Sequence, residues 1–219
     1  MFTGFNLKKL VVLTLAFVFS VALALTVYQG GVDAFDTEIQ GYVFAQGREG
    51  LVAGMYQVLA HLGDWYVYTG VCLLLLAFKT TRFSYGFPLS LVSILSVITH
   101  KLVKRAVLRP RPDAALYLIS TPVDTSFPSG HALASALFFG MLAKLIFYYA
   151  EHDGGSLHFY ATPHPTKLYI RQSNKILVAI FACVLMIWLI GFARVYVGVH
   201  WPTDVIGSWL MAIAILCMM

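Results

Sequence analysis

The chain has 219 residues, of which 59% are hydrophobic and 11% are charged, and its mean hydropathy is +0.78. Soluble domains carry about 25% charged residues, so this composition excludes an ordinary water-soluble protein and predicts one integral membrane domain over residues 1–219. The formal net charge of +5 is small and scattered, which argues against a nucleic-acid-binding protein. The cysteines, Cys72, Cys183 and Cys217, stand in apolar runs at unrelated spacings, which indicates small core residues rather than metal ligands or disulfide partners.

The first apolar run, residues 10–32, contains no charged residue and follows Lys8 and Lys9. A lysine pair, an apolar run and a late Ala-Leu-Ala also occur in cleaved signal peptides, but a signal core is only about 7–15 residues long. The longer run therefore predicts a retained membrane span. Because basic residues favour the cytoplasmic side, the N-terminus is predicted to be cytoplasmic.

Residues 30–64 mix charged and apolar side chains and are too polar for a span yet too apolar for a free loop. This mixture predicts one or two interfacial helices on the outer surface. The segment closes with the run from His61 to Trp65, in which Trp65 is expected to anchor at the interface. His61 and, further on, His100 stand near span ends on the outer side, where a place at the interface is favoured over a supporting place in the site.

Five further spans are predicted from the remaining apolar runs, and the second span is expected to begin a turn or more before Trp65. The predicted spans are residues 65–78, 83–100, 131–150, 176–192 and 202–219. The expected fold class is therefore all-α, a six-span transmembrane helical bundle with an interfacial helix or two between the first and second spans.

The charge distribution orients these spans. The basic residues of the segments predicted to be cytoplasmic are Lys8, Lys9, Lys79, Arg82, Lys167, Arg171 and Lys175. Both termini are then cytoplasmic in the plasma (inner) membrane, residues 151–175 form a cytoplasmic hairpin, and residues 101–127 and 194–201 lie outside. The exception is the outer loop after His100, which carries Lys101, Lys104, Arg105, Arg109 and Arg111. A bound anion would account for this exception to the positive-inside pattern.

Lys104 and Arg111 form the first polar cluster. They stand seven residues apart, close to two helical turns, but Pro110 and Pro112 disfavour a helix in the residues that precede them. The helix is predicted to end near Leu108, with Arg111 folding back over its end. The other basic residues of this loop are interpreted as side chains that extend toward the membrane interface: Lys101, Arg105 and Arg109.

The second cluster is Phe-Pro-Ser-Gly-His-Ala, residues 127–132, directly before an apolar run. Ser129 is a strong helix N-cap, and the first backbone N–H groups beyond it have no partner inside the helix. Such an N-terminus carries partial positive charge and attracts a phosphate. Gly130 allows a ligand to approach the backbone, and His131 adds a side chain that titrates near neutral pH. By itself the pattern also fits a capped span with a boundary histidine.

The third cluster runs from Arg194 through His200 to Asp204. Pro202 suits the first turn of a helix, which places His200 just before the sixth span and Asp204 in its first turn. The carboxylate can then hold one ring nitrogen of His200 and leave the other free to attack. All three clusters fall on one membrane face in the predicted topology, and their histidines, cations and helix N-terminus fit phosphoryl transfer.

Together the clusters resemble the signature of the type 2 phosphatidic acid phosphatase family, which shares its site with the vanadium haloperoxidases. The matching motifs are Lys104-x6-Arg111-Pro112, Pro128-Ser129-Gly130-His131 and Arg194-x5-His200-x3-Asp204. The resemblance implies a metal-independent membrane lipid phosphatase with a phosphohistidine intermediate. One position departs from the family pattern, since Ala193 stands where the family has Ser, so one hydrogen bond to phosphate is expected to be missing.

By this resemblance, His200 attacks phosphorus, Asp204 orients it, and His131 protonates the leaving oxygen and later activates water. The residues implied to hold the phosphoryl oxygens are Lys104, Arg111, Ser129, Gly130 and Arg194. No cofactor and no metal ion is expected, and the sequence near these motifs has no cluster of Asp and Glu typical of a magnesium site.

The expected partners are membrane lipids and a lipid substrate whose headgroup lies at the outer boundary. The resemblance implies an isoprenyl pyrophosphate such as undecaprenyl pyrophosphate, phosphatidylglycerol phosphate or phosphatidate, and these stay open alternatives. Residues 116–119 are apolar and fit either contact with the lipid chains or an interfacial anchor. A phosphotransferase would use the same residues. A transporter is disfavoured because Pro110, Pro112, Pro128 and Pro202 stand at span ends rather than near the bilayer midplane, and Pro88 lies near the start of its apolar run.

Overall fold

The computed structural model describes the backbone of residues 7–120, 124–152 and 167–219, and the side chains of the same residues except 151–152 and 167–173. All regular structure in these ranges is helical. The elements are α1 (Leu7–Tyr28), α2 (Asp33–Ala45), α3 (Gly50–Leu62), α4 (Trp65–Ala77), the π-helix η1 (Arg82–Gly86), α5 (Phe87–Val107), the 3-10 helix η2 (Ala114–Leu116), α6 (Gly130–His152), α7 (Lys167–Tyr196) and α8 (Pro202–Met218).

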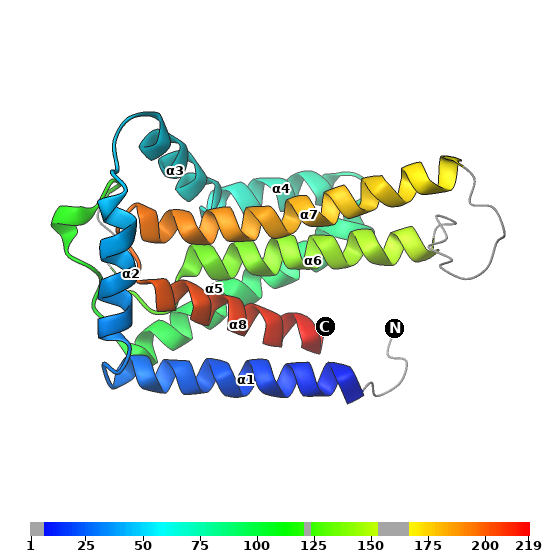
Figure 1. Ribbon diagram of the computed structural model, residues 1–219. Coiled ribbons are helices and arrows are strands. Elements are labelled where there is room, and N and C mark those ends of the chain that lie inside the picture. Colours follow the sequence, from blue (N-terminus) through cyan, green and yellow to red (C-terminus); the bar gives the residue numbers. More distant parts are fainter. Residues whose placement is uncertain (1–6, 121–123, 153–166) are drawn as a thin grey trace.

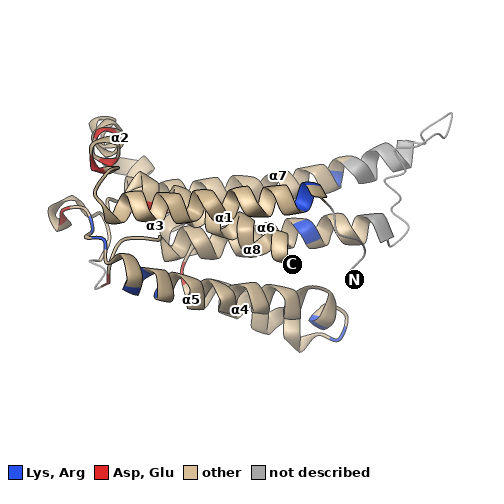
Figure 2. Ribbon diagram, turned by 90° about the horizontal axis from the view of Figure 1, so that it is seen from below, with Lys and Arg blue, Asp and Glu red and all other residues tan. Residues whose placement is uncertain are grey.

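The helices α1, α4, α5, α6, α7 and α8 run lengthwise along the molecule, whereas α2 lies across one end of it (Figure 1). Charged residues gather toward the two ends of the bundle, with a largely uncharged stretch between them (Figure 2). Charge is expensive in hydrocarbon, so this arrangement is that of a membrane protein. The helix α1 begins, and α8 ends, at the end of the bundle opposite α2.

Within the described residues, four helical stretches are long and apolar enough to cross a bilayer: Leu7–Tyr28, Arg82–Val107, Gly130–Ala150 and Asn174–Tyr196. The pair α3 and α4 meets the same requirement together but is bent by 53°, and α8 is apolar but has only 17 residues. The all-α class is confirmed, whereas the count of six spans stays a prediction.

The segment predicted to lie at the interface does form helices, α2 and α3. A separate helix begins at Trp65 after α3 ends at Leu62, and the predicted start of the second span before Trp65 stays a prediction, because the bent pair α3 and α4 is long and apolar enough to be one span. The hairpin expected over residues 151–175 is shorter, because α7 already begins at Lys167. The remainder of that hairpin, residues 153–166, lies outside the described residues.

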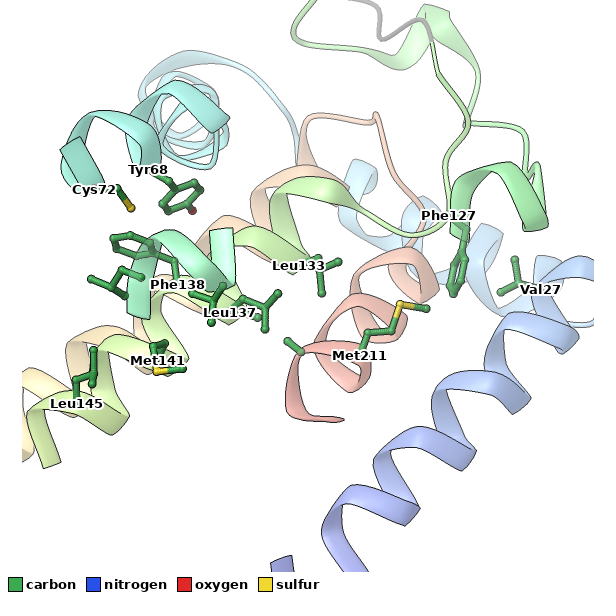
Figure 3. Packing of buried hydrophobic residues seen from close by; sticks show 14 residues of the cluster. Val27, Tyr68, Cys72, Phe127, Leu133, Leu137, Phe138, Met141, Leu145 and Met211 are labelled. Atoms are coloured by element: carbon green, nitrogen blue, oxygen red, sulfur yellow. The ribbon is translucent and has the colours of Figure 1, made fainter. Parts of the chain in front are cut away.

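The helix α6 is central and packs against α5, α7 and α8. In Figure 3, Tyr68 and Cys72 of α4 lie next to Phe138 of α6, while Phe127 and Met211 lie toward the other end of the same cluster. In a bilayer, the fit between helices contributes more to their association than the hydrophobic effect does. The core of this bundle therefore depends on close contacts along α6.

Glycines allow α8 to approach its neighbours closely. A Cβ added at Gly207 would lie 2.6 Å from Cε2 of the fully buried Phe127. A Cβ added at Gly191 of α7 would lie 2.5 Å from Cζ2 of Trp209 in α8. Small residues let helix backbones come together in this way. Because Phe127 stands just before α6, its contact with Gly207 brings the N-termini of α6 and α8 together.

Candidate active site

The N-terminus of α8 presents Asp204 next to His200. Pro202 is the first residue of α8, so Asp204 falls in the first turn, as predicted. Asp204 Oδ2 accepts a hydrogen bond from the Trp201 backbone N–H at 2.8 Å, lies 3.2 Å from His200 Nδ1, and also accepts from the Ser126 hydroxyl. Because Asp204 is fully buried, these contacts hold the carboxylate in place and, through it, the imidazole.

The other ring nitrogen of His200, Nε2, lies 3.2 Å from Arg111 Nη1. A guanidinium only donates hydrogen bonds, so Nε2 accepts with its lone pair while Nδ1–H faces Asp204. Burial, together with the positive charges of Arg111, Arg194 and Lys104, holds the pKa of His200 well below its ordinary value. The imidazole is therefore neutral near neutral pH with a lone pair on Nε2, which is the form that a nucleophile requires.

Arg109 binds the second oxygen of Asp204. Its Nη1 donates to Asp204 Oδ1 at 3.0 Å, and its Nη2 donates to Asp36 Oδ2 at 2.6 Å. The side chain is only 4% exposed, so the prediction that Arg109 extends to the membrane interface is wrong. Burial disfavours the cation, but the charges and hydrogen bonds of the two carboxylates outweigh it and raise the pKa of Arg109. The sequence did not reveal this role because Asp36 and Asp204 stand 73 and 95 residues away.

Asp36 ties α2 to the start of α8. It is fully buried, and its Oδ1 accepts a hydrogen bond from the Thr203 backbone N–H at 2.9 Å while its Oδ2 accepts from the Thr203 hydroxyl. A carboxylate is stabilised at a helix N-terminus by the helix dipole. The helix that crosses the end of the bundle is thereby attached to the same helix terminus that carries Asp204.

Arg111 stands just beyond the end of α5. The helix ends at Val107 and is closed by Leu108 in the left-handed conformation, with φ of 53°, which confirms the predicted end near Leu108. Beyond this turn, Arg111 Nη1 donates to the Val199 carbonyl oxygen at 2.6 Å. Arg111 thus reaches the loop between α7 and α8.

Asp124 joins Lys104 to Arg111. Its Oδ2 lies 3.1 Å from Lys104 Nζ, and its Oδ1 lies 2.5 Å from Arg111 Nη2. Partial burial favours the protonated acid, but the hydrogen bonds and charges of Arg111 and Lys104 outweigh it and lower the pKa of Asp124 to about 2. The two cations therefore flank a single anionic group, and a phosphate binds between basic side chains in the same manner.

The start of α6 forms the opposite side of the site. The Ser129 hydroxyl accepts a hydrogen bond from the Ala132 N–H at 3.4 Å, which is the bond of an N-cap. Ser129 is fully buried, and its backbone N–H donates to the Asp204 carbonyl oxygen at 3.3 Å. Gly130 faces the ring of His100, since an added Cβ would lie 3.5 Å from its Cδ2. The contact of Ser129 with phosphate stays a prediction.

Arg194 enters the site from the last turn of α7. It is 4% exposed, and its Nε has no hydrogen-bond partner in the part of the chain that the structure describes. Leaving a buried donor unpaired is expensive, so this guanidinium retains donor capacity that an anion would use. The neighbouring Ala193 is fully buried and belongs to an apolar cluster.

Asp64, to which the sequence assigned no role, contacts His131. Asp64 Oδ1 lies 2.7 Å from His131 Nε2. Its Oδ2 accepts a hydrogen bond from the Tyr66 hydroxyl at 2.7 Å and lies 3.0 Å from His61 Nδ1. The signal that could have pointed to Asp64 is a carboxylate three residues after a histidine, at the start of an apolar run.

A cavity of about 800 Å³ brings the predicted site residues together. The predicted residues that line it are Lys104, Arg111, Gly130, His131, Arg194 and His200. Asp204 is fully buried and contacts His200, and the fully buried Ser129 directly precedes Gly130. His61 and His100, for which a place at the membrane interface was favoured over a supporting place in the site, also line the cavity. Its apolar wall comes from α4 and α5 and includes Trp65, Tyr68, Ile94, Val97 and Ile98.

The described residues contain no group of three or more His, Cys, Asp or Glu side chains suited to a metal ion. What the cavity does contain is a neutral histidine beside a carboxylate, a second histidine and several cations. These groups can attack phosphorus, transfer a proton and neutralise phosphoryl oxygens.

The sequence has recognisable relatives. A sequence model described as the PAP2 superfamily matches residues 85–219, which include all three motifs. The chain is 30% identical over 162 residues to an undecaprenyl-diphosphatase of Sulfolobus acidocaldarius, covering 72% of this chain and 64% of that protein. It is 29% identical over 116 residues to phosphatidylglycerophosphatase B of Bacillus subtilis, covering 53% of this chain and 47% of that protein. The chain thus spans less than two thirds of either relative.

Two solved structures share the fold. A transmembrane PAP2 type phosphatidylglycerolphosphate phosphatase from Bacillus subtilis superposes with a TM-score of 0.73 at 22% identity and covers 94% of each chain. Aquifex aeolicus LpxE superposes with a TM-score of 0.55 at 23% identity, covering 83% of this chain and 93% of that one. The family match over residues 85–219 and the apolar helices lead to one assignment. The chain belongs to the PAP2 superfamily and is a membrane protein.

Proposed function

We propose that this protein is a metal-independent membrane lipid phosphatase that removes the terminal phosphate from a lipid phosphate or pyrophosphate. The observation that carries the proposal is a single cavity lined by two histidines, His200 and His131, and by the cations Lys104, Arg111 and Arg194. The curated relatives support the same chemical class, because one is named for a lipid diphosphate and the other for a phosphatidylglycerol phosphate.

In the first step, the lone pair on His200 Nε2 attacks phosphorus, and the bond from phosphorus to the bridging oxygen breaks. Asp204, which faces Nδ1 at 3.2 Å, stabilises the positive charge that develops on the imidazole. The cations neutralise the equatorial oxygens. His131 donates a proton to the leaving oxygen, so the lipid departs without gaining a negative charge.

In the second step, a water molecule attacks the phosphohistidine. His131, which is now neutral, accepts a proton from this water, and the bond between phosphorus and His200 Nε2 breaks. Inorganic phosphate leaves, and both histidines return to their starting protonation states. The reaction consumes one water molecule for each phosphate released.

The apolar wall of the cavity supports a lipid substrate. Trp65, Ile94 and Ile98 line the cavity and are also exposed on the surface of α4 and α5, where the uncharged stretch of the bundle would contact lipid. A headgroup can then enter the cavity while its chains stay in the bilayer. We propose an isoprenyl pyrophosphate, phosphatidylglycerol phosphate or phosphatidate as the substrate, with the site on the extracytoplasmic side of the plasma (inner) membrane.

The proposal is tested by phosphate release from these lipids with purified protein in detergent and a chelator present. We expect release by the wild type, and a loss of about 10²–10⁴-fold in His131→Ala, the range for general acid–base catalysis. His200→Ala should lose activity and also fail to form the acid-labile phosphoenzyme that the wild type forms with ³²P-labelled substrate. The exposed Arg105 serves as a control, and Arg105→Ala should retain full activity. Near-normal release by His200→Ala, or inhibition of the wild type by the chelator, would contradict the proposal.

A further inference from the structure

The break between α3 and α4 brings the main chain against His131. The two helices meet at a bend of 53°, and Gly63 lies in the bend. A Cβ at Gly63 would lie 3.0 Å from His131 Cδ2 and 2.9 Å from Ile190 Cγ2. A residue without a side chain is therefore required for the bend to approach the imidazole this closely. The next residue, Asp64, lines the cavity.

Both oxygens of Asp64 have partners. Oδ1 lies 2.7 Å from His131 Nε2, while Oδ2 accepts from the Tyr66 hydroxyl at 2.7 Å and lies 3.0 Å from His61 Nδ1. The contacts to Oδ2 come from residues on either side of the bend and orient the carboxylate. Oδ1 is thus presented to His131 in a defined direction.

His131 stands in a cation-rich cavity, since Arg111, Arg194 and Lys104 line the same space. To act as an acid, His131 must carry a second ring proton and hence a positive charge, which these cations disfavour. Asp64 is the carboxylate in contact with the His131 ring. It therefore supplies the negative charge that the protonated imidazole needs.

We propose that Asp64 is a positioning residue for His131, a role that rests on the proposed function. Asp64 Oδ1 accepts the Nε2–H of His131, sets the orientation of the ring and leaves Nδ1 to exchange the catalytic proton. That proton passes from Nδ1 to the leaving oxygen in the first step and returns to Nδ1 from water in the second, while Asp64 stays ionised throughout. The site then contains two histidine–carboxylate pairs, with His200–Asp204 for attack and His131–Asp64 for proton transfer.

The test uses leaving groups of different basicity. An alkoxide needs a proton in order to leave, whereas a nitrophenolate does not. We would measure kcat/KM, which covers the steps through formation of the phosphoenzyme, for dodecyl phosphate and for a nitrophenyl phosphate that carries the same dodecyl chain. Asp64→Asn keeps the size of the side chain and removes its charge. We expect kcat/KM of Asp64→Asn to fall about 10–100-fold for the alkyl ester, within the range for proton transfer, and less than about threefold for the aryl ester.

Glu38 provides the matched control, because it is an exposed carboxylate on α2. Glu38→Gln should leave both values unchanged. Equal losses on the two esters in Asp64→Asn would overturn the positioning role, since a structural or binding defect does not depend on the leaving group. No loss on either ester would overturn it as well. A wild type that releases phosphate from neither ester would instead refute the proposed function, and the role of Asp64 with it.

A second variant tests the same role if Asp64→Asn does not fold. Tyr66→Phe removes one hydrogen bond from Oδ2 and leaves the carboxylate in place. We expect a loss of about two- to fivefold on the alkyl ester, the size of one modest hydrogen bond, and no loss on the aryl ester. The same loss on both esters would again contradict the proposal.

Discussion

At the scale of single residues, the site depends on charges that are buried together. Arg109 lies between the carboxylates of Asp36 and Asp204, and each of these carboxylates also accepts hydrogen bonds from the N-terminal region of α8. Such a group is stable only while every charge keeps its partner. The orientation of His200 therefore depends on Arg109, which contacts Asp204 but not the imidazole.

Arg109→Gln should destabilise the protein strongly, because it leaves Asp36 and Asp204 buried without their cation. Removing one partner of a buried ion pair typically costs about 3–5 kcal/mol. Thermal unfolding in detergent would measure the effect. The control is Arg105→Gln at the exposed arginine in the last turn of α5, which should unfold at the wild-type temperature. Identical unfolding temperatures for the two variants would show that the buried ion pairs contribute little.

The pH dependence of phosphoenzyme formation should report the lowered pKa of His200. A nucleophile is lost when pH falls below its own pKa, and burial and the neighbouring cations hold this pKa well below the ordinary value of 6.5. We therefore expect single-turnover labelling, corrected for ionisation of the substrate, to persist as pH falls through 6.5. A decline in labelling centred near 6.5 would show that His200 has an ordinary pKa.

At the scale of the elements, two close contacts position the histidines to which we assign the chemistry. The bend at Gly63 brings α3 and α4 against His131. The contact of Gly207 with Phe127 holds the start of α6 beside the start of α8. Both contacts need a residue without a side chain, because another helix or ring already fills the space.

Gly207→Ala should destabilise the protein even though alanine favours a helix more than glycine does. Its Cβ would lie 2.6 Å from the Phe127 ring, and overpacking of this kind costs about 1–3 kcal/mol. The matched control is Gly70→Ala in α4, where the described residues leave space around the added Cβ. We expect a lower unfolding temperature for Gly207→Ala alone. An unfolding temperature for Gly207→Ala at or above that of Gly70→Ala would indicate that the ring moves without strain.

At the scale of the whole molecule, the site occupies one end of the bundle. The helix α2 and the loops that carry Arg111 and His200 lie at that end, whereas the turn between α4 and η1 lies at the other (Figures 1 and 2). That turn includes Lys79, and η1 begins at Arg82. Basic residues favour the cytoplasmic side, so these two residues support the proposal that the site faces outward.

Cysteine labelling in intact cells would test this orientation. In a background without Cys72, Cys183 and Cys217, we expect Glu49→Cys, between α2 and α3, to react with a membrane-impermeant maleimide from outside. Thr80→Cys, in the turn between α4 and η1, should react only after the membrane is made permeable. Both positions are exposed on the protein surface, so a difference in labelling between them reports the side of the membrane on which each one lies. The opposite result would place the site in the cytoplasm.

The sequence by itself determined the features that depend on a few neighbouring residues. Apolar runs set where the long helices form, Pro110 and Pro112 set the end of α5 near Leu108, and Pro202 set the start of α8. The three motifs were also local, and they indicated six residues that the cavity does gather.

Only the tertiary structure decided which carboxylates serve these groups. Asp36 binds Arg109 across 73 residues, Asp64 contacts His131 across 67, and Asp124 joins Lys104 to Arg111 from further along the connection between α5 and α6. None of these pairs is close in the sequence. The first forms where α2 crosses the end of the bundle, the second where α3 bends into α4, and the third where a loop folds over the site. A charge in a sequence reveals its position along the chain, but its partner depends on the packing that brings distant segments within about 3 Å, the length of a hydrogen bond.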